Sequence, residues 1–111
     1  MADLDKITGD IAAWLFAILS AARGPVPLNV ARLAGHMATR LMGTAEDTAA
    51  AWGRAVRGSI ARGHVVDDGE ALTLVQTDLV KTMLEQMRGT EYPRLAPKYL
   101  ERARKAVADR G

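Results

Sequence analysis

A single strong β-hairpin signal stands in a chain whose other segments have helical periodicity. Two β-prone runs, residues 64–66 and 71–75, flank an Asp-Asp-Gly-Glu tetrapeptide at residues 67–70. An Asp-Gly pair between such runs is typical of a tight hairpin, in which both turn residues take positive φ. We therefore predict one hairpin, with its turn at Asp68 and Gly69, in a mainly α fold.

Two amphipathic helices are predicted near the start of the chain. Apolar residues recur at offsets of three and four between Ile7 and Ala22, which places them on one helical face, and Gly24-Pro25 should end this helix. Residues 26–28 are bounded by prolines and indicate a short extended piece. Asn29 is a good N-cap for a second helix, from about residue 30 to residue 41. Its apolar positions, which include Leu41, should face the core.

A third helix is expected from Thr44 to about Arg62, with Gly63 as its stop. Thr44 followed three residues later by an acidic residue is typical of a helix N-terminus. If Ile60 faces inward, Trp52 shares its side. The opposite face is then small and basic, and it holds Ala50, Ala51, Arg54, Arg57, Gly58 and Ala61.

Two further helical segments follow the hairpin. Thr77 should cap a helix over about residues 78–88, with Leu79 on its apolar side and Gly89-Thr90 as its end. Residues 92–97 contain two prolines and indicate a linker or strap, so the last helix is expected over residues 98–110. Its apolar stripe is thin and needs a partner surface. We divide the chain into a domain at residues 1–76 and a helical C-terminal extension at residues 77–111, the expected dimer contact.

The composition argues against most enzymatic sites. The chain has no cysteine, and its two histidines, His36 and His64, lie on different predicted elements without carboxylates at metal-ligand spacing. No serine or threonine has an adjacent His–acid pair, and no glycine-rich phosphate loop occurs. We therefore expect no catalytic residue, metal or cofactor, and a protein that is not an enzyme.

The most apolar stretch, residues 11–22, is too short for a membrane span. Crossing a bilayer core takes roughly 20 residues, and acidic rather than basic residues precede this stretch. We expect a cytoplasmic protein without a membrane contact. Frequent Ala, Gly and Arg are typical of a GC-rich genome, which suggests a bacterial or phage source.

The order helix, short strand, helix, helix and hairpin resembles the winged helix-turn-helix family. Residues 54–74, where a basic helix ends at Arg62-Gly63 and runs into a hairpin, resemble the recognition helix and wing of bacterial regulators. The resemblance covers about residues 7–75. It implies that the helix at residues 44–62 lies in the major groove of double-stranded DNA and that the wing approaches the backbone or minor groove. The DNA-contacting positions it implies are Thr44, Thr48, Ala51, Arg54, Arg57 and Gly58.

The wing departs from this pattern because its tip is acidic. Asp67, Asp68 and Glu70 stand where DNA-binding wings usually carry Arg or Lys, although turn chemistry alone would explain Asp68. The leading hypothesis is a sequence-specific DNA-binding transcriptional regulator, acting as a homodimer. The alternative is a winged-helix protein-protein interaction module, an adaptor or an inhibitor of a host factor, which binds no DNA and uses the acidic wing for a protein partner.

Overall fold

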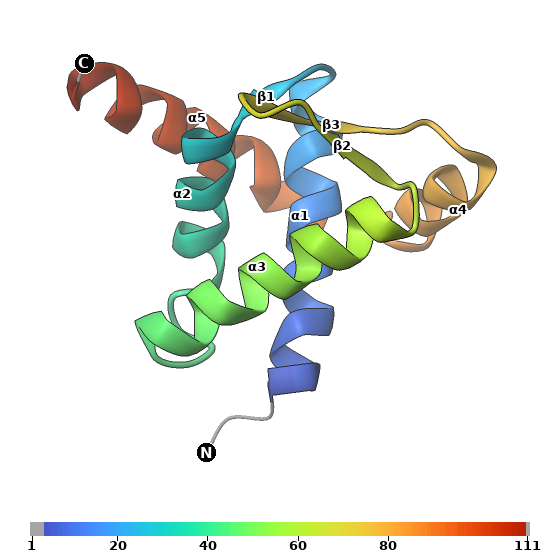
Figure 1. The fold of residues 1–111 in the computed structure, drawn as a ribbon, viewed down its shortest axis with the longest axis horizontal. Helices are drawn as coiled ribbons and strands as arrows, with labels where there is room; N and C mark the ends of the chain where they lie inside the picture. Colours follow the sequence, from blue (N-terminus) through green and yellow to red (C-terminus); the bar gives the residue numbers. More distant parts are fainter. Residues whose placement is uncertain (1–3, 111) are drawn as a thin grey trace.

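The computed structural model describes residues 4–110. Residues 1–3 of the predicted domain (1–76) and residue 111 of the predicted C-terminal extension (77–111) lie outside this range. The described chain is mainly α, with five helices and a small three-stranded antiparallel sheet (Figure 1). In chain order the elements are α1 (Leu4–Ala22), β1 (Val26–Pro27), α2 (Leu28–Thr39), α3 (Ala45–Ala61), β2 (Val65–Asp67), β3 (Ala71–Leu74), α4 (Asp78–Gln86) and α5 (Glu91–Arg110).

Helix α1 lies at the centre of the molecule. It contacts α2, α3 and α5, and in Figure 1 the other helices surround it. Its predicted apolar face is confirmed, because Ile11, Leu15 and Ile18 are fully buried. The helix ends at Ala22, and Arg23 then takes a positive φ of 57° before Gly24-Pro25. None of the helices in residues 4–110 combines the length and apolar composition needed to cross a membrane.

The sheet has the strand order β1-β3-β2, so the strand nearest the N-terminus pairs with the second strand of the hairpin. Val26 pairs with Leu72, and Val65 pairs with Leu74. These four side chains are buried in the main core together with α1. The backbone N–H of Leu28 also donates to the carbonyl of Glu70 at 3.0 Å, which ties the start of α2 to the hairpin turn.

The predicted hairpin is confirmed, but its turn is of a different kind. Gly69 has a φ of 92°, whereas Arg23 is the one non-glycine residue at positive φ in the described chain, so Asp68 does not share that conformation. The Asp67 carboxylate accepts from the N–H of Gly69 at 2.8 Å. The Asp68 carboxylate accepts from the N–H groups of Glu70 and Ala71, both at 2.9 Å. The backbone N–H of Asp68 also donates to the Ala71 carbonyl at 3.3 Å, so the two turn residues are Gly69 and Glu70, one position later than predicted.

Helix α2 begins earlier and ends earlier than predicted. Pro27 occupies the N-cap position without a side-chain cap, and the Asn29 side chain instead accepts from the N–H of Val30 at 2.9 Å. At the other end the chain turns after Thr39, where the N–H of Met42 donates to the Thr39 carbonyl at 2.9 Å. The expectation that Leu41 is a core residue is therefore wrong, since it lies beyond the helix and is 92% exposed.

The predicted orientation of α3 about its own axis is also wrong. Its buried residues are Thr48, Ala51, Ala55 and Ser59, while Ile60 is 38% exposed. Ala51 and Ala55 pack with Ile7 and Ile11 of α1 in a small core cluster. Small residues allow two helices to approach closely, so packing on α1 selected this stripe over the larger apolar residues.

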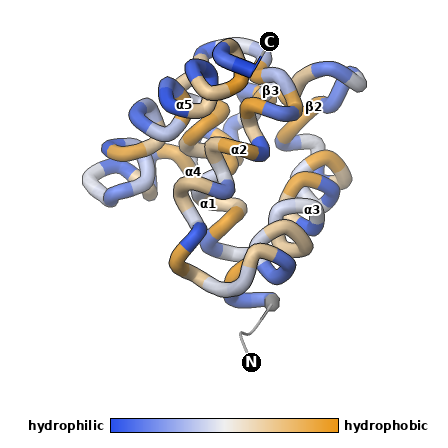
Figure 2. Tube along the Cα trace, turned by 90° about the vertical axis from the view of Figure 1, so that its left-hand side faces the viewer, coloured by the Kyte–Doolittle hydropathy of each residue, from blue (hydrophilic) through white to orange (hydrophobic). Residues whose placement is uncertain are grey.

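Helix α5 includes the segment that we predicted to be a linker. Pro93 lies in its first turn, where a backbone N–H has no partner within the helix, and Pro97 lies inside the helix at the cost of one hydrogen bond. Tertiary contacts offset that cost: the rings of Tyr92 and Tyr99 lie edge-on to Trp14, with centroids at 4.9 and 5.6 Å. Hydrophobic positions recur among hydrophilic ones along α5, as in an amphipathic helix (Figure 2).

The apolar stripe of α5 is covered by its own chain. Ala96, Leu100 and Ala103 are buried in the main core, and α5 contacts both α1 and α2. The shorter helix α4 contributes Val80 to the same core, and its predicted N-cap is confirmed because Thr77 accepts from the N–H of Val80 at 3.2 Å. Leu79, expected on the inner side of α4, is 57% exposed.

Candidate functional site

The exposed face of α3 combines small residues with two arginines. The helix begins as predicted, with the Thr44 hydroxyl accepting from the N–H of Asp47 at 3.1 Å. An exposed stripe at spacings of four, three and four residues then runs along the helix, apart from the buried residues that pack on α1. It is formed by Ala50, Arg54, Arg57 and Ala61.

The structure separates the six DNA-contacting positions that the resemblance implied. Thr44, Arg54 and Arg57 are exposed, and Gly58 is half-buried. Two of the six lie on the opposite side of α3, which corrects the expectation that they share an exposed face. Thr48 is 3% exposed and its hydroxyl donates to the Thr44 carbonyl at 3.1 Å, and Ala51 is fully buried.

The two exposed arginines differ in their surroundings. Arg54 donates from Nη2 to Oδ1 of Asp5 on α1 at 2.9 Å, and both side chains are well exposed. An exposed pair of this kind contributes little to stability, about 0–1 kcal/mol. Arg57 forms no ion pair with any residue in the 4–110 range, and its guanidinium lies over Gly53, where an added Cβ would come 3.0 Å from Nη1. Arg57 is therefore the more available cation on this face.

Two of the three acidic residues of the hairpin, Asp67 and Asp68, bond through their carboxylates to backbone N–H groups of the turn. The Asp68 carboxylate accepts from the backbone N–H groups of Glu70 and Ala71, and these hydrogen bonds lower the pKa of Asp68 from its ordinary value of 3.8. Asp67, Asp68 and Glu70 are all exposed, so their negative charge still lies at the tip of the hairpin. The explanation of Asp68 by turn chemistry is confirmed.

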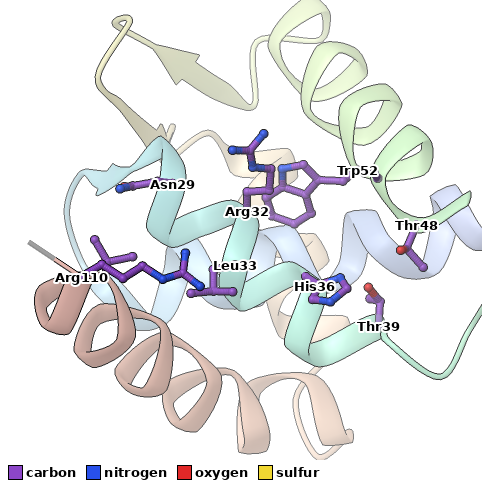
Figure 3. A pocket seen from close by; sticks show the side chains of 10 residues that line it. Asn29, Arg32, Leu33, His36, Thr39, Thr48, Trp52 and Arg110 are labelled. Carbon is purple, nitrogen blue, oxygen red and sulfur yellow. The ribbon is translucent and has the colours of Figure 1, made fainter. Parts of the chain in front are cut away.

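A cavity of about 550 Å³ opens between α2, α3 and the end of α5. Helix α2 contributes Arg32 and His36, α3 contributes Trp52, and α5 contributes Arg110, as Figure 3 shows. No local sequence pattern identifies this cavity, because its lining residues are distant in the chain. The sequence offered one signal, a glycine at position 35 inside a predicted helix. The structure explains this glycine, because a Cβ on Gly35 would lie 2.4 Å from the Trp52 ring.

The two histidines have unlike surroundings. His36 is exposed at the cavity, as expected of a surface residue of the second helix. His64 is 6% exposed and lies edge-on to Phe16 with ring centroids 5.9 Å apart. Its Nδ1 has no hydrogen-bond partner among residues 4–110. Within the part of the chain that the structure describes, no group of three or more His, Cys, Asp or Glu residues could hold a metal ion.

Comparison with known proteins finds no matching family model, no similar curated protein and no similar solved structure. The functional interpretation of α3 and of the cavity therefore depends on their own geometry.

Proposed function

We propose that the chain is a winged helix-turn-helix protein that binds duplex DNA with α3 in the major groove. Two features support the fold assignment. The first is the order α1, β1, α2, α3, β2, β3. The second is the three-stranded sheet, in the order β1-β3-β2, with β2 in contact with α3, an arrangement that fits a wing. In such folds the third helix reads base edges, and its own exposed side chains determine what it can contact.

The observation that carries the proposal is the exposed stripe of α3. Ala50 and Ala61 leave room for a close approach to the groove, and Arg54 and Arg57 supply cations between them. The guanidinium fork pairs with O6 and N7 of guanine together, and it equally binds phosphate. Arg57 has no ion pair within residues 4–110 to break, whereas Arg54 must exchange Asp5 for DNA, a small cost for an exposed ion pair.

A second candidate function is a protein-interaction module. The acidic hairpin tip favours it, because exposed carboxylates on the wing would repel phosphate and attract a basic protein surface. The Arg54–Asp5 pair also favours it, since it lowers the free positive charge on α3. We place this function second because a contact between the acidic hairpin tip and a basic protein surface would give Arg57 and the small residues beside it no role.

A homodimer remains part of the DNA-binding proposal, because one unit of this size covers little DNA and two copies double the contact. The apolar residues of α5 are buried within their own chain, so the dimer contact would use other surfaces than the C-terminal stripe that we first expected.

Binding to a random-sequence duplex, followed by fluorescence anisotropy at about 50 and about 200 mM salt, tests the proposal. About four phosphate contacts should make log K fall with log salt at a slope near −3.6. Arg57→Ala should weaken binding, while Arg94→Ala, which removes an exposed arginine of α5, should not. The absence of binding at the lower salt concentration would refute DNA binding and favour the interaction module.

A further inference from the structure

The cavity between α2, α3 and α5 results from how the helices pack. Helix α3 packs mainly against α1, and α2 packs mainly against α5, so α2 and α3 meet only in part. The Trp52 ring lies against the backbone of α2 at Gly35, where no side chain could fit, and it forms a wall between the two helices. The last turn of α5, at Val107 and Arg110, borders the remaining side.

The cavity has an apolar wall and a cationic rim. Leu33, Trp52 and Val107 supply the apolar surface. Arg32 and Arg110, from two helices, form the cationic rim, and His36 adds a nitrogen group beside them (Figure 3). None of the lining residues is acidic, and neither arginine forms an ion pair within residues 4–110.

The hydroxyl groups in the cavity add no further donor. The Thr39 hydroxyl donates to the Gly35 carbonyl at 2.7 Å, and the Thr48 hydroxyl donates to the Thr44 carbonyl at 3.1 Å. The donors left for a ligand are therefore those of Arg32, His36 and Arg110 and the side-chain amide of Asn29. The two arginines are the charged donors among them, and charged donors favour an anion.

We propose that this cavity binds a small organic carboxylate with a flat apolar body. The flat body packs on the Trp52 indole and against Leu33, and the carboxylate pairs with the guanidinium groups that line the cavity, Arg32 and Arg110. A volume of about 550 Å³ falls in the range of small-molecule sites, roughly 300–1,000 Å³. The site is independent of DNA binding and is tested in its absence.

Titration of the full chain with 2-naphthoate, followed by ¹H–¹⁵N NMR, tests the site. The chain has two tryptophans and hence two indole N–H signals. Trp52 lines the cavity, while Trp14 is 4% exposed between the two tyrosines of α5. The Trp52 signal should shift saturably and the Trp14 signal should stay in place.

Two control ligands separate the contributions of charge and apolar surface. The neutral isostere 2-naphthylmethanol should bind roughly tenfold or more weakly, because it lacks the charged partner for the arginines. Inorganic phosphate alone should bind more weakly than 2-naphthoate, because it does not use the Trp52 wall. Equal affinity for 2-naphthoate and phosphate would show that the rim binds any anion, and it would overturn the proposal.

Three variants locate the binding. Arg110→Ala should reduce 2-naphthoate affinity roughly tenfold, whereas Arg94→Ala, on the same helix but outside the cavity, should not change it. Ala49→Trp, at an exposed position in the cavity lining, should block binding without disturbing the core. A shift confined to Trp14, no shift up to about 10 mM 2-naphthoate, or unchanged affinity in Arg110→Ala would refute the site.

Discussion

Replacement of Gly35 by alanine tests the contact that forms one wall of the cavity. An added Cβ would lie 2.4, 2.6 and 2.9 Å from three carbon atoms of the Trp52 ring. Overlap with three atoms of a rigid ring requires the ring or α2 to move, and such overpacking costs about 1–3 kcal/mol. The gain in helix propensity from glycine to alanine, about 1 kcal/mol, acts in the opposite direction.

Gly58→Ala is the matched control for this substitution. Gly58 also lies inside a helix, but a Cβ there meets only the flexible end of Arg62, at 3.3 Å. Both variants gain the same helix propensity, so the difference between their unfolding free energies isolates the clash with Trp52. We expect Gly35→Ala to be less stable than Gly58→Ala by about 1–3 kcal/mol in urea unfolding followed by circular dichroism. Equal stability of the two variants would show that Trp52 does not lie on Gly35.

One deletion and two substitutions test the fold further. Deletion of residues 91–110 should abolish cooperative unfolding, because it uncovers the core side of α1 and α2; a folded truncated protein would show that α5 is a separable extension. Trp14→Ala should cost about 3–5 kcal/mol in urea unfolding, since its ring is 4% exposed, and a cost below about 1 kcal/mol would contradict its packing between Tyr92 and Tyr99. The lowered pKa of Asp68 stabilises the fold above pH 3.8, and this contribution is lost as the pH falls toward the lowered pKa. Asp68→Asn should therefore reduce the acid dependence of stability, and an unchanged acid limb would show that the turn does not depend on this carboxylate.

Local signals predicted the parts of the fold that depend on few residues. The apolar stripe of α1, the caps at Thr44 and Thr77 and the glycines that end α3 and α4 each follow from the chemistry of neighbouring residues. The hairpin followed in the same way, although the carboxylates of Asp67 and Asp68 changed its turn.

The orientation of α3 could not be derived locally. Its sequence allows two faces, one with Ile60 and one with Ala51, and the choice depends on the surface that receives the helix. The close contact with Ile7 and Ile11 favours small residues, which hydrophobicity alone ranks below isoleucine. As a consequence Ala51 was placed on the wrong side, while Arg54 and Arg57 were placed correctly as exposed residues. Thr48, which the family resemblance implied as a DNA contact, is buried on the same side as Ala51.

The C-terminal helix and the cavity depend on contacts between distant segments. Pro97 weakens a helix locally, and only the packing of α5 on α1 and α2 offsets that effect. Likewise, Arg32 and Arg110 are far apart in the sequence and border one cavity because α2 packs on α5. No local pattern predicts either result.

The central claim is that the exposed stripe of α3 contacts DNA, and titration of the ¹⁵N-labelled chain with a duplex tests it most directly. The backbone signals of Ala50, Arg54 and Arg57 should shift on binding, and those of Ala55 and Ser59, on the side facing α1, should shift far less. Shifts confined to the hairpin residues 67–70, or no shift in any α3 signal at low salt, would contradict the account.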